Sequence, residues 1–345
     1  MDDVVPVVMA GEEAYFVGGA VRDQLLGRPV VDVDVACGEP QQAARRYREV
    51  AGGALFRLSE RHGAWRVALA NRTVDFTPLR DGIDADLATR DFTINAIAVP
   101  VGGGEAVDPF AGRDDLTARV LRAVTDGVFE DDPLRLLRAV RLEDELGFGI
   151  EPGTEALVRR HASLVDRPAG ERILAELRRL SPAGFRRLDG LGLLAPLGGT
   201  LERLERVQPA PHPDFLLAVV FGENVLRLPV SNETARFTRT LLAARRPRDG
   251  SPRDVHRFRR ATEPWALEAL AFLGAPELYD AVRAARESDP AEPLVRGDEL
   301  GLPPGPAVGR LLERIAEERA AGTISTREEA LELVRRERDR LTDAT

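Results

Sequence analysis

The chain has 345 residues, 43% hydrophobic and 30% charged, which exceeds the usual size of one core and predicts a globular protein with two or more domains. Its first residues are acidic and no apolar run reaches the roughly 18 residues of a membrane-spanning helix, so we expect a cytoplasmic protein with no membrane partner. The net charge of -9 excludes an overall basic surface but not a local basic groove, and the single cysteine, Cys37, excludes internal disulfides and cysteine-rich metal sites.

Strand and helix patterns alternate in the first part of the chain, to about residue 125. In chain order, the sequence predicts a strand at 14–19, a short helix at 19–27 that ends at Gly27, and a second strand at 30–37. Residues 65–79 alternate about Asn71 and Arg72, which is typical of a hairpin, and residues 91–99 lead through a glycine-rich turn to 107–116. We therefore expect a small α/β domain with a mixed sheet.

From residue 132 onward the apolar residues recur with a helical period, and segments rich in proline and glycine separate the helical patterns. The predicted helices include 133–146, 170–180, 185–197, 265–274 and 308–322, and the candidate linkers are 163–171, 208–214, 245–254 and 286–307. The predicted fold class is therefore α+β, with a small mixed sheet followed by a mostly α-helical remainder.

Two aspartates on the second predicted strand are the first candidate site. Asp32 and Asp34 are two residues apart, so both side chains leave one side of the strand while the valines between them face the other. Carboxylates held in this way suit Mg²⁺, which takes one or two protein carboxylates and completes its shell with water and substrate phosphate. The alternative is a half-exposed strand with its charges in solvent, and for an isolated Asp-x-Asp pair this alternative is the commoner one.

The residues before these aspartates favour a phosphate site. Gly18 and Gly19 fall at a strand-to-helix turn, where backbone N–H groups can approach a phosphate that Arg22 can also bind. The alternatives are a plain tight turn and an ion pair between Arg22 and Asp23. Phosphate groups beside metal-binding carboxylates are what nucleotidyl transfer requires, because the metal activates the attacking hydroxyl and neutralises the leaving pyrophosphate. Asp75 is placed to add a third carboxylate, although an exposed hairpin acid is a nearly equal interpretation.

Together these motifs resemble the bacterial class II tRNA nucleotidyltransferase and poly(A) polymerase family, one of the polymerase-β-like nucleotidyltransferases. VGGAVRDQLLGRPVVDVDVA (17–36) resembles the family's GGxVRDxLLG and DxD signature, and TRDFTINAIAV (89–99) is similar to its RRDFTINA motif. Further similar segments are 107–124, 129–150, 170–180 and, in the tRNA-specific members, 293–331. The resemblance implies a nucleotidyltransferase head at 1–125, a nucleotide-recognising neck at 126–200, and an elongated helical tRNA-binding body and tail at 201–345.

The activity that the resemblance implies is template-independent addition of C and A residues to the 3′ end of tRNA, with CTP and ATP as donors, Mg²⁺ as cofactor and no DNA partner. Asp32 and Asp34 would hold the metal, and Asp75 would complete the catalytic carboxylates. The family reads the base with a Glu-Asp-x-x-Arg helix, matched here by residues 131, 132 and 135, because an acid and an arginine mimic a Watson–Crick partner. The residues implied at the nucleotide and its phosphates are Gly18, Gly19, Arg22, Arg90, Asp91, Asn95, Asp132, Arg135, Arg138 and Arg141.

The base-reading helix also has a plain structural interpretation. Asp132 stands before Pro133, which is a favourable pair for simply starting a helix. Arginines at intervals of three lie near one helix face and are usually solvated; in a cleft they would hold a triphosphate. Asp131 also replaces the family's longer glutamate, which leaves the part of this residue open.

Two departures from the family pattern bear on which nucleotides are added. The family carries an extended flexible loop before the RRDFTINA motif, and here only PLRDGIDADLAT (78–89) stands in its place. In this family a shortened loop is associated with enzymes that add only the two C residues, because the loop helps the site to accept ATP. The doubled arginine of the motif is replaced by Thr89 and Arg90.

Arginines between residues 236 and 260 outweigh the acids around them and predict a tRNA-binding surface. Those assigned to RNA are Arg245, Arg246, Arg248, Arg257, Arg259 and Arg260. Two other functions stay open. One is a poly(A) polymerase acting on other RNA, although such enzymes tend to carry a long basic tail and this chain ends in RRERDRLTDAT. The other is a catalytically idle RNA-binding protein, against which the intact Asp32 and Asp34 count.

Overall fold

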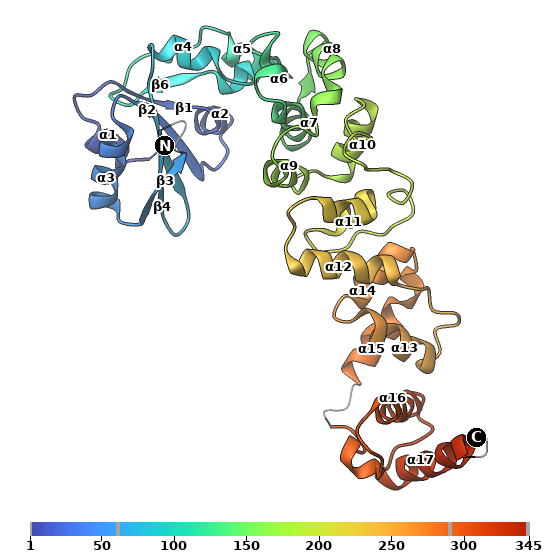
Figure 1. The fold of residues 1–345 in the computed structure, drawn as a ribbon. Coiled ribbons are helices and arrows are strands. Elements are labelled where there is room, and N and C mark those ends of the chain that lie inside the picture. The colour runs from blue at the N-terminus through green and yellow to red at the C-terminus, as the bar shows by residue number, and fades with distance from the viewer. Residues whose placement is uncertain (1, 60–62, 289–291, 343–345) are drawn as a thin grey trace. The chain divides into compact units, whose positions relative to one another are not determined.

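The computed structural model describes residues 2–59, 63–288 and 292–342 and divides into two compact units, Met1–Gly198 and Gly199–Thr345. The first unit begins with a sheet and continues in helices, and the second unit is helical (Figure 1). The expected α+β class is therefore confirmed. The limits expected near residues 125 and 200 stay predictions of domain boundaries.

The sheet of the first unit is mixed, as predicted. Its strands lie in the order β3-β4-β5-β2-β1-β6, in which β2 and β5 run parallel and all other neighbours run antiparallel. The strands are β1 (Ala14–Val17), β2 (Asp32–Cys37), β3 (Ala54–Ser59), β4 (Ala64–Ala68), β5 (Thr73–Pro78) and β6 (Ala98–Pro100). The central position of β2, between β1 and β5, places its aspartates in the middle of the sheet.

One face of this sheet is packed against helix α3 (Pro40–Ala51), which covers β4 and β5 and in turn contacts helix α1 (Val5–Val8). Val33 and Val35 of β2 are buried, and the ring centroids of Tyr47 on α3 and Phe76 on β5 lie 5.7 Å apart. Because strand side chains alternate, burial of these valines directs Asp32 and Asp34 to the opposite face. The predicted separation from the aspartates is confirmed for Val33 and Val35, whereas Val31, which was predicted to share their face, precedes β2 and is 54% exposed.

The predicted hairpin forms from β4 and β5, but its centre lies one residue earlier than expected. The Leu69 N–H donates to the Arg72 carbonyl at 2.9 Å, so the two loop residues are Ala70 and Asn71. This register pairs Val67 with Val74, and both are fully buried. Burial of the two valines decides the register of β4 against β5. A shift of one strand by one residue would move its buried valine to the opposite face of the sheet.

Helix α2 (Gly19–Leu25) follows β1 and ends before Gly27, as predicted. The segment 78–89, expected as a short loop, contains a helix, α4 (Ile83–Ala88). Leu87 of this helix is fully buried and packs with Leu79 and Ile83 into a cluster that includes Val17 and Ala36. The segment is therefore fixed to the sheet by apolar contacts.

The rest of the first unit carries short elements and the predicted helices. In chain order these are η1 (Thr93–Asn95), α5 (Gly112–Ala118), β7 (Val120–Leu121), α6 (Val128–Asp131), α7 (Leu134–Leu146), β8 (Gly149–Ile150), α8 (Pro152–Arg160), η2 (Ala162–Leu164), α9 (Gly170–Leu177) and α10 (Pro182–Gly190). Helix α7 packs against both α9 and α10, so it forms the centre of this helical part.

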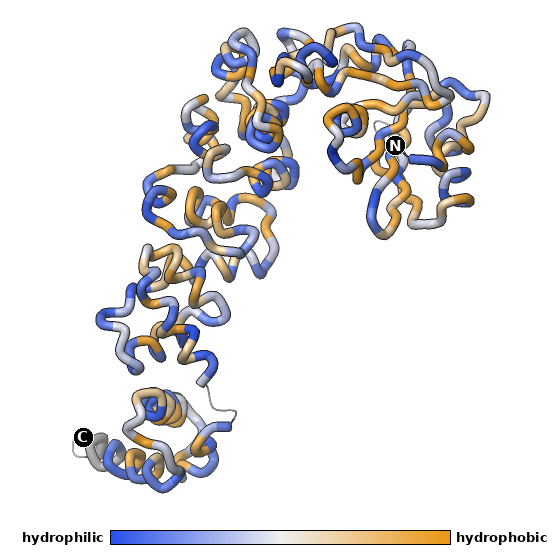
Figure 2. Tube along the Cα trace, turned by 180° about the vertical axis from the view of Figure 1, so that it is seen from behind, coloured by the Kyte–Doolittle hydropathy of each residue, from blue (hydrophilic) through white to orange (hydrophobic). Residues whose placement is uncertain are grey.

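The second unit consists of helices, as the sequence predicted. They are α11 (Phe215–Phe221), η3 (Gly222–Arg227), α12 (Asn232–Ala243), α13 (Pro252–Thr262), α14 (Ala266–Leu273), η4 (Pro276–Leu278), α15 (Tyr279–Glu287), η5 (Gly297–Leu300), α16 (Pro306–Ala320) and α17 (Arg327–Thr342). Hydrophobic residues recur among hydrophilic ones along these helices, which is the pattern of helices with one buried side (Figure 2). The linker expected at 286–307 includes residues 289–291, and the predicted tail includes residues 343–345, which lie outside the described residues. Among the described helices, none is both long and apolar enough to cross a membrane.

Candidate active site

The turn between β1 and α2 approaches a carboxylate so closely that it requires glycine. Gly18 has φ 70°, and a Cβ at this position would lie 3.1 Å from Oδ2 of Asp34 and 3.4 Å from Nη1 of Arg90. The positive φ strains any residue other than glycine, and a Cβ would press against the Asp34 carboxylate. The turn therefore brings backbone, Asp34 and Arg90 to one point.

Asp34 is half-buried and has the most perturbed carboxyl pKa of the site. Burial raises its pKa to about 6, Arg90 opposes this shift, and the neighbouring Asp75 and Asp32 add to it. Asp32 is exposed and accepts a hydrogen bond from Thr73 Oγ1 at 2.7 Å. The two aspartates thus lie on one face, as expected, but in different surroundings.

Asp75 lies beside Asp34, in register on the adjacent strand β5. It is buried, and both of its oxygens accept hydrogen bonds from Arg66 on β4, each at 2.7 Å. The interpretation of Asp75 as an exposed hairpin acid does not match this burial. The sheet instead presents three carboxylates in a group, one of them paired with an arginine.

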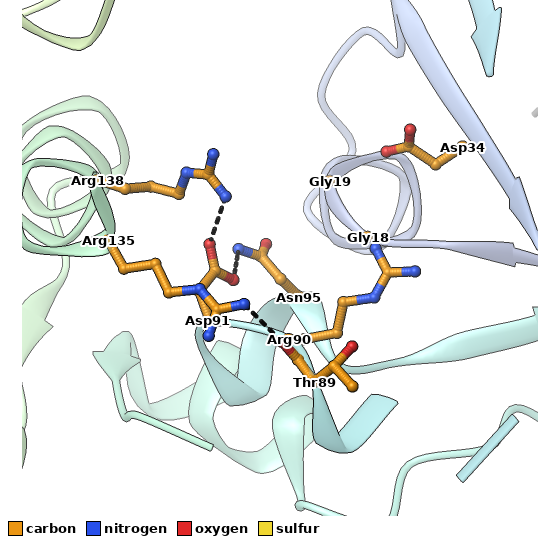
Figure 3. Close-up of a pocket in the computed structure, with 9 residues that line it drawn as sticks. All are labelled: Gly18, Gly19, Asp34, Thr89, Arg90, Asp91, Asn95, Arg135 and Arg138. Carbon is orange, nitrogen blue, oxygen red and sulfur yellow. Dashed lines mark hydrogen bonds and ion pairs between the residues drawn. The ribbon is translucent and has the colours of Figure 1, made fainter. Parts of the chain in front are cut away.

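A pocket of about 310 Å³ opens on the Gly18 side of Asp34 (Figure 3). The side chains of the β-sheet and of helix α7 approach it from opposite sides. The lining residues are Gly18, Gly19, Asp34, Thr89, Arg90, Asp91, Asn95, Arg135 and Arg138. Eight of these nine residues were predicted from the sequence as site residues, and Thr89 was not.

Asp91 connects the two sides of the pocket. Its carboxylate accepts hydrogen bonds from Arg138 Nη1 at 3.0 Å, Asn95 Nδ2 at 2.9 Å and the Phe92 amide at 2.8 Å (Figure 3). Burial alone would raise the pKa of Asp91, but Arg138, Asn95 and the amide outweigh it and hold this pKa below its usual range. Asp91 is therefore an anion that orders the pocket and also makes a local backbone contact.

Two further arginines of the pocket are held by partners on its rim. Arg135 Nη2 donates to the Thr89 carbonyl at 2.6 Å, which joins helix α7 to the segment before η1. Arg90 donates from Nε and Nη2 to Oδ2 of Asp86, at 3.1 and 2.6 Å. These contacts orient positive charge around the pocket.

Other predicted site residues lie outside the pocket lining. Arg22 pairs with Asp23 at 2.9 Å, the alternative recognised in the sequence, and also donates to Asn95 Oδ1 at 2.8 Å. Asp132 accepts from the Leu134 amide at 3.2 Å and pairs with Arg172 at 2.7 Å. Arg22 therefore supports a lining residue from behind, and Asp132 both caps α7 and pairs with α9.

Arg141 is also separated from the pocket. It is buried and pairs with Glu176 at 2.5 Å and with Glu145 at 2.8 Å. Residues three apart on a helix rotate by about 300°, so Arg141 points about 120° away from Arg135. The interval of three therefore brings only Arg135 and Arg138 to the pocket.

The arginines assigned to RNA lie on or near helix α13 in the second unit, and several are ion-paired. Arg246 pairs with Glu277 at 2.6 Å, Arg257 with Glu317 at 2.5 Å, and Arg260 with Glu313 at 3.8 Å. Arg259 is buried and pairs with Glu263, which leaves it little surface to offer a nucleic acid. Arg245 and Arg248 are exposed.

Comparison with known proteins identifies the family to which proteins similar to this chain belong. Residues 14–85 and 80–122 match the model of the poly A polymerase head domain. A CC-adding tRNA nucleotidyltransferase of Geobacter sulfurreducens is 47% identical over 49% of this chain and 40% of its own length. Two relatives match nearly end to end: an A-adding tRNA nucleotidyltransferase of Deinococcus radiodurans (32% identical, 94% of this chain and 95% of its own) and a CC-adding one of Thermus thermophilus (31%, 92% of each).

The chain belongs to the class II tRNA nucleotidyltransferase family. Among solved structures, this nucleotidyltransferase is similar to the CCA-adding enzyme of Bacillus stearothermophilus in complex with CTP, with a TM-score of 0.77, 26% identity, and coverage of 99% of this chain and 100% of that one. It shares its fold with the Thermotoga maritima CCA-adding enzyme complexed with tRNA, with a TM-score of 0.75, 23% identity, and coverage of 97% and 95%. This nucleotidyltransferase is therefore an enzyme of a family that generally uses divalent metal ions.

The aspartates on strand β2 of this nucleotidyltransferase are suitable ligands for a divalent metal ion. Asp32 and Asp34 offer oxygen ligands, which suit hard divalent cations, whereas both oxygens of Asp75 accept hydrogen bonds from Arg66. Within the described residues, no group of three or more His, Cys, Asp or Glu side chains is placed to hold a metal ion by itself. An ion held by Asp32 and Asp34 would thus complete its shell with water and phosphate oxygens, as Mg²⁺ does in nucleotide sites.

Sequence reasoning missed several residues that hold the site together. Arg66 holds Asp75, Asp86 holds Arg90, and Glu176 lies 3.5 Å from Arg138. Asp86 had a local signal, because it stands four residues before Arg90. Arg66 and Glu176 had none, since their partners are set by the strand register and by the packing of α9 on α7.

Proposed function

We propose that this nucleotidyltransferase extends the 3′ end of tRNA with C residues from CTP, releases pyrophosphate, and stops before the terminal A. The observation that carries the proposal is the pocket itself, in which Arg90, Arg135 and Arg138 face a space bounded by Asp34. Three guanidinium groups beside a metal-binding acid match the charge of a nucleoside triphosphate with its metal. The relatives named for C addition, and the related structure with CTP, support CTP as the donor.

In the proposed reaction the 3′ hydroxyl oxygen of the tRNA attacks the α-phosphorus of CTP. The new bond joins that oxygen to phosphorus, the bond to the β-phosphate oxygen breaks, and the hydroxyl proton leaves to solvent. Bound Mg²⁺, held by Asp32 and Asp34 with Asp75 beside them, would lower the pKa of the attacking hydroxyl and neutralise the leaving pyrophosphate. Arg90 and Arg138 hold the triphosphate in line, which is where most of the catalysis of phosphoryl transfer arises.

Recognition of the base falls to the start of helix α7. Arg135 lines the pocket and donates hydrogen bonds, so it can meet the ring nitrogen and carbonyl acceptors of cytosine. Asp132 precedes it by three residues and can accept from the exocyclic amine. Arg172, which pairs with Asp132 at 2.7 Å, holds this acid as an anion; although burial opposes this, the pKa of Asp132 lies below its usual range.

Helix α4 supports the restriction to C addition. The segment that the family uses as a flexible loop is short here, and its buried Leu87 fixes it to the sheet. Arg90 is held in addition by Asp86 from the same helix. A pocket rim fixed in this way has little freedom to adapt from the pyrimidine to the larger purine. Because the acceptor is tRNA, we also propose a cytoplasmic location.

The deciding experiment supplies Mg²⁺ and tRNA ending before CCA, after the first C, or after CC, with CTP and ATP given singly and together. We expect two C residues on the first acceptor, one on the second, and no A on the third. Full CCA synthesis would remove the restriction, and long A tracts on unrelated RNA would favour a poly(A) polymerase.

The same assay includes an Asp34→Asn variant and a chelator as controls. Loss of a metal ligand is expected to lower kcat by about a thousandfold or more, equivalent to several kcal/mol. Chelation is expected to abolish transfer, and added Mg²⁺ to restore it. A wild-type protein that binds tRNA but adds no nucleotide under any condition would support the idle RNA-binding alternative.

A further inference from the structure

We propose that Phe56, on the outermost strand of the sheet, holds the single-stranded 3′ end of the tRNA acceptor by stacking on one of its bases. The inference rests on the proposed function and concerns a residue for which neither the motifs nor the pocket gives a role. Three observations support it: the register of four strands, the exposure of the ring, and the side from which the acceptor can reach Asp34.

The register places Phe56 in one row with the acids of the site. Phe56 pairs with Arg66, Arg66 pairs with Asp75, and Asp75 lies in register with Asp34. Residues directly opposite on neighbouring strands project from the same face of a sheet. Neighbouring strands are about 4.8 Å apart, so Phe56 lies about 14 Å from Asp34 on the face that carries the carboxylates.

Phe56 is exposed although it lies in a strand. Its exposed fraction is 44%, and the Arg66 side chain next to it is 32% exposed. Helix α3 covers β4 and β5 from the opposite face, where the core lies. Leu58 on the same strand is also exposed, at 43%, but Phe56 is the aromatic residue that continues the row of active-site residues and is placed to contact what lies on that row.

The other side of Asp34 belongs to the donor. Gly18 and the arginines of the pocket lie there, and Val17, the β1 partner of Asp34, is buried under helix α4. The acceptor hydroxyl must therefore reach Asp34 from the side of β5, β4 and β3. A chain arriving from that side passes the ring of Phe56 on β3 and then Arg66 on β4 before it reaches Asp34.

The chemistry of this row suits a single RNA strand. Proteins bind unpaired nucleotides by stacking bases on aromatic side chains beside basic groups, often on an open sheet face. The 3′ end of a tRNA acceptor is unpaired, and its bases are available for stacking. Phe56 offers a ring and Arg66 a guanidinium, so the row combines the two elements of such a platform.

The test compares full-length wild-type protein with Phe56→Ala, Phe56→Tyr and the control Val50→Ala. Val50 is an exposed residue of α3, distant in the fold from the carboxylate face. Transfer of C to tRNA lacking CCA is measured at varied tRNA and at varied CTP. Binding is followed separately without CTP, on tRNA whose last nucleotide carries 2-aminopurine, which loses fluorescence when it stacks.

We expect Phe56→Ala to lower kcat/KM for tRNA about tenfold or more, because stacking of one base is worth about that factor. The KM for CTP should stay unchanged, and the fluorescence quenching should be lost in Phe56→Ala and kept in Phe56→Tyr and Val50→Ala. Unchanged tRNA parameters and quenching in Phe56→Ala would overturn the inference, as would an altered oligomeric state with normal tRNA kinetics, which would make β3 a protein contact. An inactive wild-type protein would instead contradict the proposed function.

Discussion

At the scale of single residues, the site depends on how closely backbone and side chains approach one another. Gly18 shows this most directly, because its missing Cβ leaves room for Asp34 and Arg90 together. Asp75 is a second example of such a close approach, because it lies beside Asp34 in the sheet and is also paired with Arg66. The sequence predicted which acids and glycines matter, but not which arginine neutralises which acid.

Gly18→Ala is predicted to disable the site. The new Cβ would lie 3.1 Å from Asp34 Oδ2 and would strain a backbone with φ 70°, so we expect kcat/KM for CTP to fall at least tenfold, equivalent to about 1.4 kcal/mol. Steady-state kinetics at varied CTP measure this effect. Gly27→Ala is the matched control, because Gly27 has φ 66° but open space around it. If both variants lose activity equally, backbone strain and not the approach to Asp34 is responsible.

At the scale of elements, helix α7 carries the arginines of the pocket and is itself held by α9. Glu176 of α9 is buried between Arg141 and Arg138, which it approaches at 2.5 and 3.5 Å. Arg141 has turned away from the pocket and anchors the helix, while Arg138 reaches Asp91. The two helices therefore fix the direction of Arg138 through one shared acid.

Glu176→Gln is predicted to destabilise the first unit and to weaken nucleotide binding. Removing the charge leaves Arg141 buried without its main partner, so we expect the free energy of unfolding to fall by about 3 kcal/mol in a denaturant titration. The KM for CTP should rise several-fold, because Arg138 loses part of its support. Glu171→Gln, an exposed acid on the same helix, should change stability by no more than about 0.5 kcal/mol. Equal stability of the two variants would contradict the anchoring role of Glu176.

At the scale of the whole molecule, the distribution of charge matters more than the total of -9. In the second unit, arginines of α13 pair with acids of α16, as in the pairs of Arg253 with Glu318 and of Arg257 with Glu317. These pairs neutralise part of the positive surface that the sequence predicted for tRNA. Exposed arginines in the segment before α13, such as Arg248, are better placed for phosphate.

Arg248→Ala is predicted to weaken tRNA binding through electrostatics alone. Loss of one phosphate contact should reduce the slope of log K against log salt by somewhat less than one, and lower affinity similarly for tRNAs of different sequence. Filter binding from low to moderate salt measures the slope. Arg283→Ala, an exposed arginine of α15 outside the predicted group, should leave it unchanged. Equal slopes for wild type and Arg248→Ala would place the phosphate contacts elsewhere.

The sequence by itself determined those structural features that depend only on residues close together in the chain. Alternation placed Asp32 and Asp34 opposite buried valines, Gly18 marked a turn whose positive φ favours glycine, and the helical period covered the second unit. The ordered motifs also predicted the family, and eight of the nine residues around the pocket. These features depend on local spacing, which a linear sequence shows.

Only the tertiary structure decided the partners of the charged groups. The hairpin turn is centred one residue away from the predicted position, and its register pairs Arg66 with Asp75. The orientation of α7 about its axis places Arg138 against Asp91 and Arg141 against Glu176. Helix α4 likewise lies within the segment 78–89, which was expected to be a loop, because its Leu87 packs into the buried apolar cluster on the sheet. An ion pair or an apolar contact between distant parts of the chain depends on strand register and helix packing, which no local pattern encodes.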